Sequence, residues 1–131
     1  MAEPGRALAA PGLSAVVEVL LRKNDKLYIN DGLYGVFWEL RYDAHDRYAS
    51  RAVHNGKLLD GDTQEFELLG PTCDSDDKMR GRIHLPRDIT VGDYIEFGAI
   101  GAYSLSGRSD FNGFYSNLVV NITDPTERPP G

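Results

Sequence analysis

The chain has 131 residues, which suits one domain of ordinary size and is too short for two. Apolar residues make up 41% and charged residues 26%, the balance of a folded globular chain and not of a disordered one. Twenty Asp and Glu oppose fourteen Lys and Arg, and the resulting net charge of -6 argues against a nucleic-acid binder, which needs a concentrated basic face.

Residues 1–12 are rich in Ala, Gly and Pro and predict a loop with a short helical turn. The chain then alternates short β-branched and aromatic runs with turn signals such as Asn30-Asp31-Gly32 and Asn55-Gly56. We expect strands, in chain order, over residues 14–21, 27–29, 36–42, 49–54, 64–70, 82–85, 93–97 and 117–122. A flexible Pro-rich tail over residues 123–131 completes the chain. Many short strands between closely spaced turns predict a mainly β barrel or sandwich.

Several classes of protein are excluded by what the sequence lacks. The single cysteine, Cys73, cannot form an internal disulfide framework or a cysteine zinc site, and it suits the reducing cytoplasm. No apolar stretch approaches the roughly 20 residues of a membrane span, and we expect no signal peptide because an acid lies near the front. The densest basic cluster, Arg80, Arg82 and Arg87, is thin and is broken off by Asp88.

Two acidic segments are candidates for chemistry. Residues 70–77 carry three acids within four positions, which repel one another unless a cation lies among them. Composition alone favours a solvated acidic turn, with a metal or amine site as the alternative. A calcium-binding EF-hand is excluded because the required Gly and Glu are missing. The second segment, Tyr42-Asp43-Ala44-His45-Asp46, reads most simply as a surface histidine beside acids.

A third segment combines glycines with aromatic residues, over residues 97–104 and 110–114. Glycines there indicate a close approach of the backbone to another group. The sequence leaves open whether that group is a ligand or a neighbouring strand crossing.

Seven segments together resemble, in the family's order, the C-terminal part of the fold-type III pyridoxal-phosphate-dependent amino-acid decarboxylases, ornithine/lysine branch. They are Glu3-Pro4-Gly5-Arg6, Tyr28-Ile29-Asn30-Asp31-Gly32-Leu33-Tyr34-Gly35, Tyr42-Asp43, Gly70-Pro71-Thr72-Cys73-Asp74, Val91-Gly92-Asp93, Gly101-Ala102-Tyr103 and Phe111-Asn112-Gly113-Phe114. The resemblance implies a Greek-key-like β-barrel or sandwich of the alanine racemase/ornithine decarboxylase type over residues 13–122. It also implies that residues 1–12 are a remnant of the end of a (β/α)8 barrel.

The resemblance implies part of a site for pyridoxal 5'-phosphate. Glu3 would pair with the pyridinium nitrogen and keep the ring an effective electron sink. Gly5 and Arg6 would hold the cofactor phosphate, and the Tyr103 hydroxyl would be another contact.

The resemblance also assigns residues to the substrate, a diamino acid. Cys73 and Asp74 would reach into the active site of a partner subunit across a two-fold dimer, where Cys73 would help control protonation after carbon dioxide leaves. Asp43 and Asp74 would bind the distal amine, Phe111 would pack near that site, and Asn112 would brace the loop. Two acids suit the distal ammonium of ornithine or lysine, whereas diaminopimelate carries a carboxylate there.

The family's catalytic barrel of about 250 residues and its Schiff-base lysine have no counterpart in these residues. The lysines here, Lys23, Lys26, Lys57 and Lys78, lie in expected turns or loops. We therefore expect a truncated or split product of a decarboxylase gene of polyamine biosynthesis, inactive without a barrel chain. The alternative is a non-catalytic β domain that docks on full-length decarboxylase subunits and regulates them. In either case we expect aggregation or obligate association of the chain alone, because a sheet edge stays exposed.

Overall fold

The computed structural model describes residues 1–2, 4–42, 48–114 and 116–122. The candidate residues Glu3 and Asp43 and the tail over residues 123–131 lie outside this part of the chain. The division of the chain at residue 12 stays a prediction.

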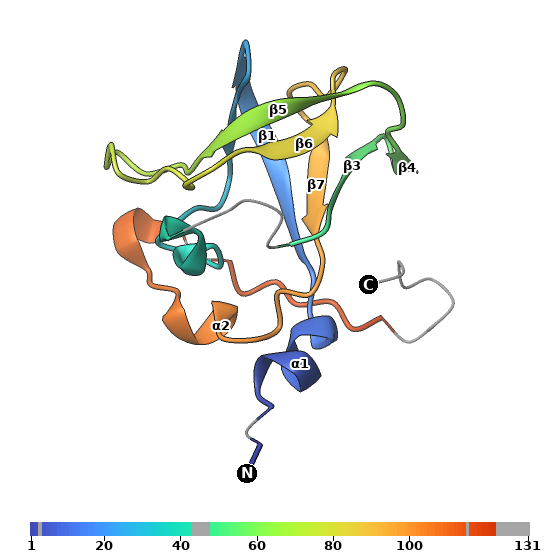
Figure 1. The fold of residues 1–131 in the computed structure, drawn as a ribbon. Coiled ribbons are helices and arrows are strands. Elements are labelled where there is room, and N and C mark those ends of the chain that lie inside the picture. The colour runs from blue at the N-terminus through green and yellow to red at the C-terminus, as the bar shows by residue number, and fades with distance from the viewer. Residues whose placement is uncertain (3, 43–47, 115, 123–131) are drawn as a thin grey trace.

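Seven strands form a single curled sheet, in the order β4-β3-β7-β1-β2-β5-β6 (Figure 1). The strands are β1 (Ala15–Lys23), β2 (Lys26–Ile29), β3 (Ser50–His54), β4 (Lys57–Leu58), β5 (Thr63–Leu69), β6 (Ile83–Pro86) and β7 (Tyr94–Phe97). Neighbouring strands are antiparallel except β2 and β5, which pair in parallel. The sequence-based prediction of a mainly β fold of the barrel or sandwich type is confirmed.

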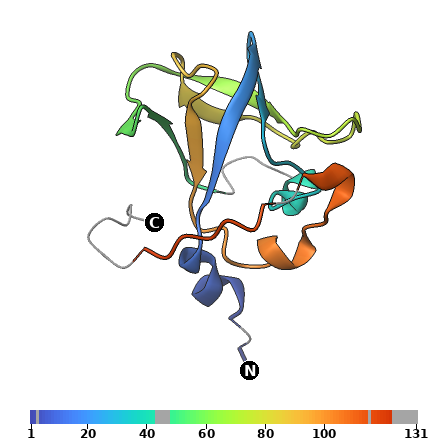
Figure 2. The same ribbon diagram turned by 180° about the vertical axis from the view of Figure 1, so that it is seen from behind.

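The helices are short and gather at one end of the curled sheet, as both views show (Figures 1 and 2). They are α1 (Arg6–Ala9), α2 (Ser104–Gly107) and the 3-10 turns η1 (Ala10–Gly12), η2 (Trp38–Arg41) and η3 (Phe111–Gly113). The helical turn expected within residues 1–12 is thereby confirmed. Among the described residues, no helix has the length and apolar character needed to cross a lipid bilayer.

The core joins buried side chains of the strands to Leu33, Phe37, Leu40 and Ile100 from the turns and loops. Along β1, Val17 and Val19 are buried, whereas Val16 before them and Leu20 after them are 61% and 46% exposed, the alternation of a strand with one face covered. Phe37 and Phe97 meet edge to face in this core, with ring centroids 4.8 Å apart. The apolar side chains of the sheet therefore hold the helical end in place.

The strand expected over residues 36–42 is wrong, because a turn and η2 occupy this segment. Phe37 and Leu40 are both fully buried, and their spacing of three residues brings both into the core only on a helical turn. The Phe37 N–H also donates to the Gly32 carbonyl, which closes a turn and not a strand ladder. Tertiary packing overrides the β propensity of this apolar run.

The strand expected over residues 117–122 is also wrong. Within the described part of the chain no strand pairs with this segment, and Leu118 is 85% and Val120 75% exposed. A β-prone run becomes a strand only when another strand accepts its backbone hydrogen bonds. The sequence also missed β4, a two-residue partner of β3.

Candidate functional site

The structure brings together Gly5, Arg6 and Tyr103, three of the predicted cofactor residues. The guanidinium carbon of Arg6 lies 5.4 Å from the centroid of the Tyr103 ring. A Cβ added at Gly5 would lie 3.0 Å from the Tyr103 hydroxyl oxygen, so a larger residue would crowd it. A guanidinium, a phenol hydroxyl and a backbone free of side chain thus meet at one place, which suits a phosphate.

Gly101 explains why these residues meet. Its N–H donates to the Ala10 carbonyl at 2.9 Å. A Cβ at Gly101 would lie 2.3 Å from the Ala9 carbonyl oxygen, so only glycine lets this loop pack against the turn that follows α1. The Trp38 indole N–H then donates to the Tyr103 carbonyl at 3.1 Å. The close approach that the sequence left open at Gly101 is therefore made by the chain's own backbone.

Glu39 belongs to this group and was missed by the sequence analysis. Its Oε1 accepts a hydrogen bond from Arg6 Nη2 at 2.6 Å, and its Oε2 accepts one from the Tyr48 hydroxyl at 2.8 Å. This hydrogen bond to a 7% exposed carboxylate raises the pKa of Arg6, so the guanidinium is held charged and in place. The available signal was a lone acid inside an otherwise apolar run.

A second group contains Cys73, Asp74, Phe111 and Asn112, all predicted, together with Tyr34. The Tyr34 hydroxyl donates to Asp74 Oδ2, and the Tyr34 and Phe111 rings pack with centroids 4.3 Å apart. Asn112 Nδ2 donates to Cys73 Sγ at 3.2 Å. The bracing role of Asn112 stays a prediction. Tyr34 lay inside a motif of the sequence analysis without an assigned role.

Asp74 is held as a carboxylate. The hydrogen bond from Tyr34 is the main cause that lowers the pKa of Asp74, and the Asp76 N–H donates to Oδ1 at 2.9 Å. The same bond raises the pKa of Tyr34, which therefore stays a donor. A fixed anionic carboxylate is the group that binds an ammonium.

The acidic segment is more than a solvated turn, because Asp77 is only 3% exposed. Its carboxylate accepts hydrogen bonds from the Leu33 N–H at 2.8 Å and from the Thr72 hydroxyl at 2.8 Å. A Cβ at Gly32 or at Gly70 would lie within 2.3 Å of an Asp77 carboxylate oxygen. Asp77 therefore fastens the loop of Tyr34 to the loop of Cys73 and Asp74.

The two groups remain separate within one chain. No hydrogen bond, ion pair or ring contact joins Gly5, Arg6 or Tyr103 to Cys73 or Asp74 in the residues that the structure describes. The segment from Tyr34 to Glu39 contributes to both groups, because Glu39 binds Arg6 and Tyr34 binds Asp74.

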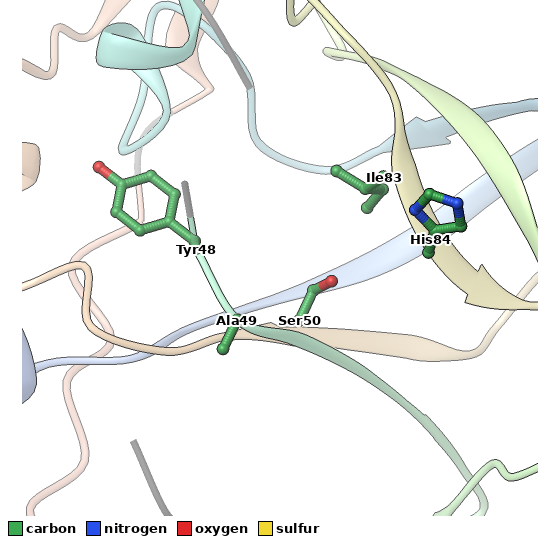
Figure 3. A pocket seen from close by; sticks show the side chains of 5 residues that line it. All are labelled: Tyr48, Ala49, Ser50, Ile83 and His84. Atoms are coloured by element: carbon green, nitrogen blue, oxygen red, sulfur yellow. The ribbon is translucent and has the colours of Figure 1, made fainter. Parts of the chain in front are cut away.

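Figure 3 shows a pocket of about 320 Å³ at the start of β3, facing β6. Its lining residues are Tyr48, Ala49, Ser50, Ile83 and His84. None of the predicted site residues lines this pocket. Across the described residues, no three His, Cys, Asp or Glu side chains are grouped as ligands of a metal ion.

Comparison with known proteins identifies one family and several relatives of this chain. Residues 13–101 match the model of a family described as the pyridoxal-dependent decarboxylase, C-terminal sheet domain. Ornithine decarboxylase of Schizosaccharomyces pombe is 34% identical over 134 residues, 93% of this chain and 31% of that protein. Antizyme inhibitor 2 of Xenopus laevis is also 34% identical, over 91% of this chain and 29% of that protein.

The lysine/ornithine decarboxylase of Vibrio vulnificus, solved with cadaverine, superposes with a TM-score of 0.67 at 33% identity, over 88% of this chain and 33% of that chain. The chain thus spans about a third of the length of the relatives it matches. The family model and the superposed structure agree, and the chain belongs to the pyridoxal-dependent decarboxylase C-terminal sheet domain family.

Proposed function

We propose that this chain is the sheet domain of a pyridoxal 5'-phosphate-dependent decarboxylase that acts on ornithine or lysine in polyamine biosynthesis. The observation that carries the proposal is the presence of two groups in one domain: a cationic cradle at Arg6 and a fixed carboxylate at Asp74. The positive charge of Arg6 suits the cofactor phosphate, and the negative charge of Asp74 suits the distal ammonium of the substrate.

The cradle fits the cofactor phosphate. The side-chain-free backbone of Gly5 leaves room beside the Tyr103 hydroxyl, and Glu39 holds the Arg6 guanidinium charged at the same place. Glu3 is proposed for the pyridine nitrogen. When bound, the cofactor supplies the electron sink that decarboxylation needs.

The second group fits the substrate. Asp74 is proposed to bind the distal ammonium together with Asp43, and Phe111 to close the apolar side of that site. The exposed thiol of Cys73, oriented by Asn112, is proposed to hold the proton that replaces the departing carboxylate. Because the two groups are separate within one chain, a two-fold dimer is the arrangement in which each site takes one group from each subunit.

The cofactor-anchoring lysine is proposed to come from a (β/α)8 barrel, since none of the four lysines of this chain matches that motif. The test is therefore a reconstitution of the chain with a barrel segment, followed by measurement of amine release. We expect Asp74→Asn to raise the KM for ornithine and lysine at least tenfold, because it removes the charge on the ammonium partner.

The matched control is Asp88→Asn, an exposed acid that belongs to neither group, which should leave the KM unchanged. Equal KM values for the two variants would exclude Asp74 as the amine ligand. Loss of activity in Cys73→Ala with an unchanged KM would support the thiol as the proton carrier.

A non-catalytic role is the second candidate, and the relative named Antizyme inhibitor 2 favours it, since it is as similar as the decarboxylase relative. In this role the domain binds full-length decarboxylase subunits and changes their rate or dimer state. The effect on mixing should then persist in Cys73→Ala. An effect that disappears in this variant would favour the catalytic role.

A further inference from the structure

A pocket of about 780 Å³ lies beside the second group, between η2 and the loop that leads into β6. Four cationic side chains line it: Arg41, Lys78, Arg80 and Arg82. Two acids, Glu67 and Asp76, share the lining. The chain as a whole is acidic, with a net charge of -6, so a pocket of the opposite sign is a local feature and not a consequence of composition.

Two of the four cationic side chains form ion pairs with carboxylates of the described residues, and the other two do not. Lys78 pairs with Glu67, and Arg82 Nη1 pairs with Asp25 Oδ2 at 2.6 Å. Arg41 and Arg80 form no ion pair with a carboxylate of the described chain. Both guanidinium groups can therefore add contacts to an anion, Arg41 while it also contacts the Tyr34 ring.

The backbone holds these two arginines next to each other. The Arg80 N–H donates to the Leu40 carbonyl at 3.0 Å, which joins the residue before Arg41 to Arg80 itself. The neighbouring Met79 is 1% exposed, and its N–H donates to the Leu68 carbonyl at 3.1 Å. The stems of both side chains start from fixed positions, so little backbone ordering is needed when a ligand binds.

We propose that this pocket binds a small polyvalent anion, with Arg41 and Arg80 as its charged ligands. Planar guanidinium groups form paired hydrogen bonds with phosphate and carboxylate oxygens. The volume is in the range of small-ligand pockets. A nucleic acid is disfavoured, because the positive charge is confined to one pocket of an acidic chain.

The pocket is connected to the second group through Arg41. Its guanidinium carbon lies 5.6 Å from the centroid of the Tyr34 ring, and the Tyr34 hydroxyl donates to Asp74. An anion on Arg41 would weaken the field that this arginine exerts on Asp74. If the proposed function holds, the anion regulates how strongly Asp74 binds the distal ammonium of the substrate.

The first test uses the 131-residue chain and inorganic pyrophosphate in isothermal titration calorimetry at low salt. We expect one saturable site, at least a tenfold loss of affinity in Arg80→Gln, and unchanged affinity in Arg87→Gln. Arg87 is the matched control because it is an exposed arginine outside the pocket lining. Equal affinity of Arg80→Gln and the unchanged chain, or no saturable binding, would overturn the proposal.

Citrate, titrated in parallel, distinguishes a carboxylate ligand from a phosphate ligand by which of the two anions binds more tightly. The link to Asp74 is tested separately, by following its carboxyl carbon in NMR pH titrations with and without pyrophosphate. We expect the pKa of Asp74 to rise when the anion is bound, and an unchanged value would refute the link. These readouts require no decarboxylase activity, so they fail or succeed independently of the proposed function.

Discussion

Single residues decide how the loops of the candidate site are held. Asp77 does this from a buried position, with three hydrogen-bond donors on its carboxylate from Leu33 and Thr72. Its neighbours Gly32 and Gly70 are glycines because the carboxylate fills the space where a Cβ would lie. The sequence marked this segment as acidic but could not separate a structural acid, Asp77, from a site acid, Asp74, because burial depends on the folded loop.

We predict that Gly70→Ala lowers the free energy of unfolding by about 1–3 kcal/mol, the usual cost of inserting a group into a filled space. The added Cβ would lie 2.2 Å from the Asp77 carboxylate oxygens and displace the carboxylate from its donors. Urea denaturation of the chain measures this. The control is Gly12→Ala, where a Cβ meets nothing within 4 Å, and the prediction is refuted if both variants are equally stable.

At the scale of elements, the parallel pair of β2 and β5 carries a charged cluster on its surface. Lys26 and Glu67 are directly opposite in this pair, with Nζ and Oε2 3.3 Å apart, and Lys78 also binds Glu67. The hydrogen bond from Lys78 is the main cause that lowers the pKa of Glu67 below its ordinary value of 4.5. Because the pKa of Glu67 is lower in the folded chain, the ionised form of Glu67 stabilises the fold.

The pH dependence of the free energy of unfolding follows from the lowered pKa of Glu67. The contribution of Glu67 to stability is complete above the ordinary pKa of 4.5 and is lost as pH falls through the lower pKa of the folded chain. We predict that Glu67→Gln costs less than about 1 kcal/mol at neutral pH, because both lysines are about half exposed. The difference from the unchanged chain should shrink in strong acid.

Urea denaturation over a pH series measures this difference. The control is Glu65→Gln on the same strand, whose carboxylate is 54% exposed and lies 3.9 Å from His84. A difference for Glu67→Gln that grows as pH falls would contradict the assignment.

At the scale of the whole molecule, the chain exposes an apolar segment along its last described residues. Leu118, Val119, Val120 and Ile122 are between 52% and 85% exposed. Contiguous apolar surface of this kind marks an interaction site or promotes aggregation. We therefore predict that the chain associates with itself when expressed alone.

Size-exclusion chromatography with light scattering measures the association. Replacing both Leu118 and Val120 by Lys should shift the chain toward the monomer, because the charges oppose burial of this segment. The control is Val91→Lys at an exposed valine in a different loop, 54% exposed, which should leave the association unchanged. A monodisperse monomer of the unchanged chain would contradict the prediction.

The sequence by itself determined the fold class, the family and most strands, because alternating β-branched runs and glycine turns act locally, and because seven motifs in the family's order are specific. It failed at residues 36–42 and 117–122, where the outcome depends on distant partners: Glu39 binds Arg6 across 33 residues, whereas 117–122 has no paired strand in the described chain. Only the tertiary structure placed Tyr34 on Asp74, buried Asp77, and gathered four cations around one pocket. The physical reason is that contacts between loops far apart in the sequence leave no periodic signal in it.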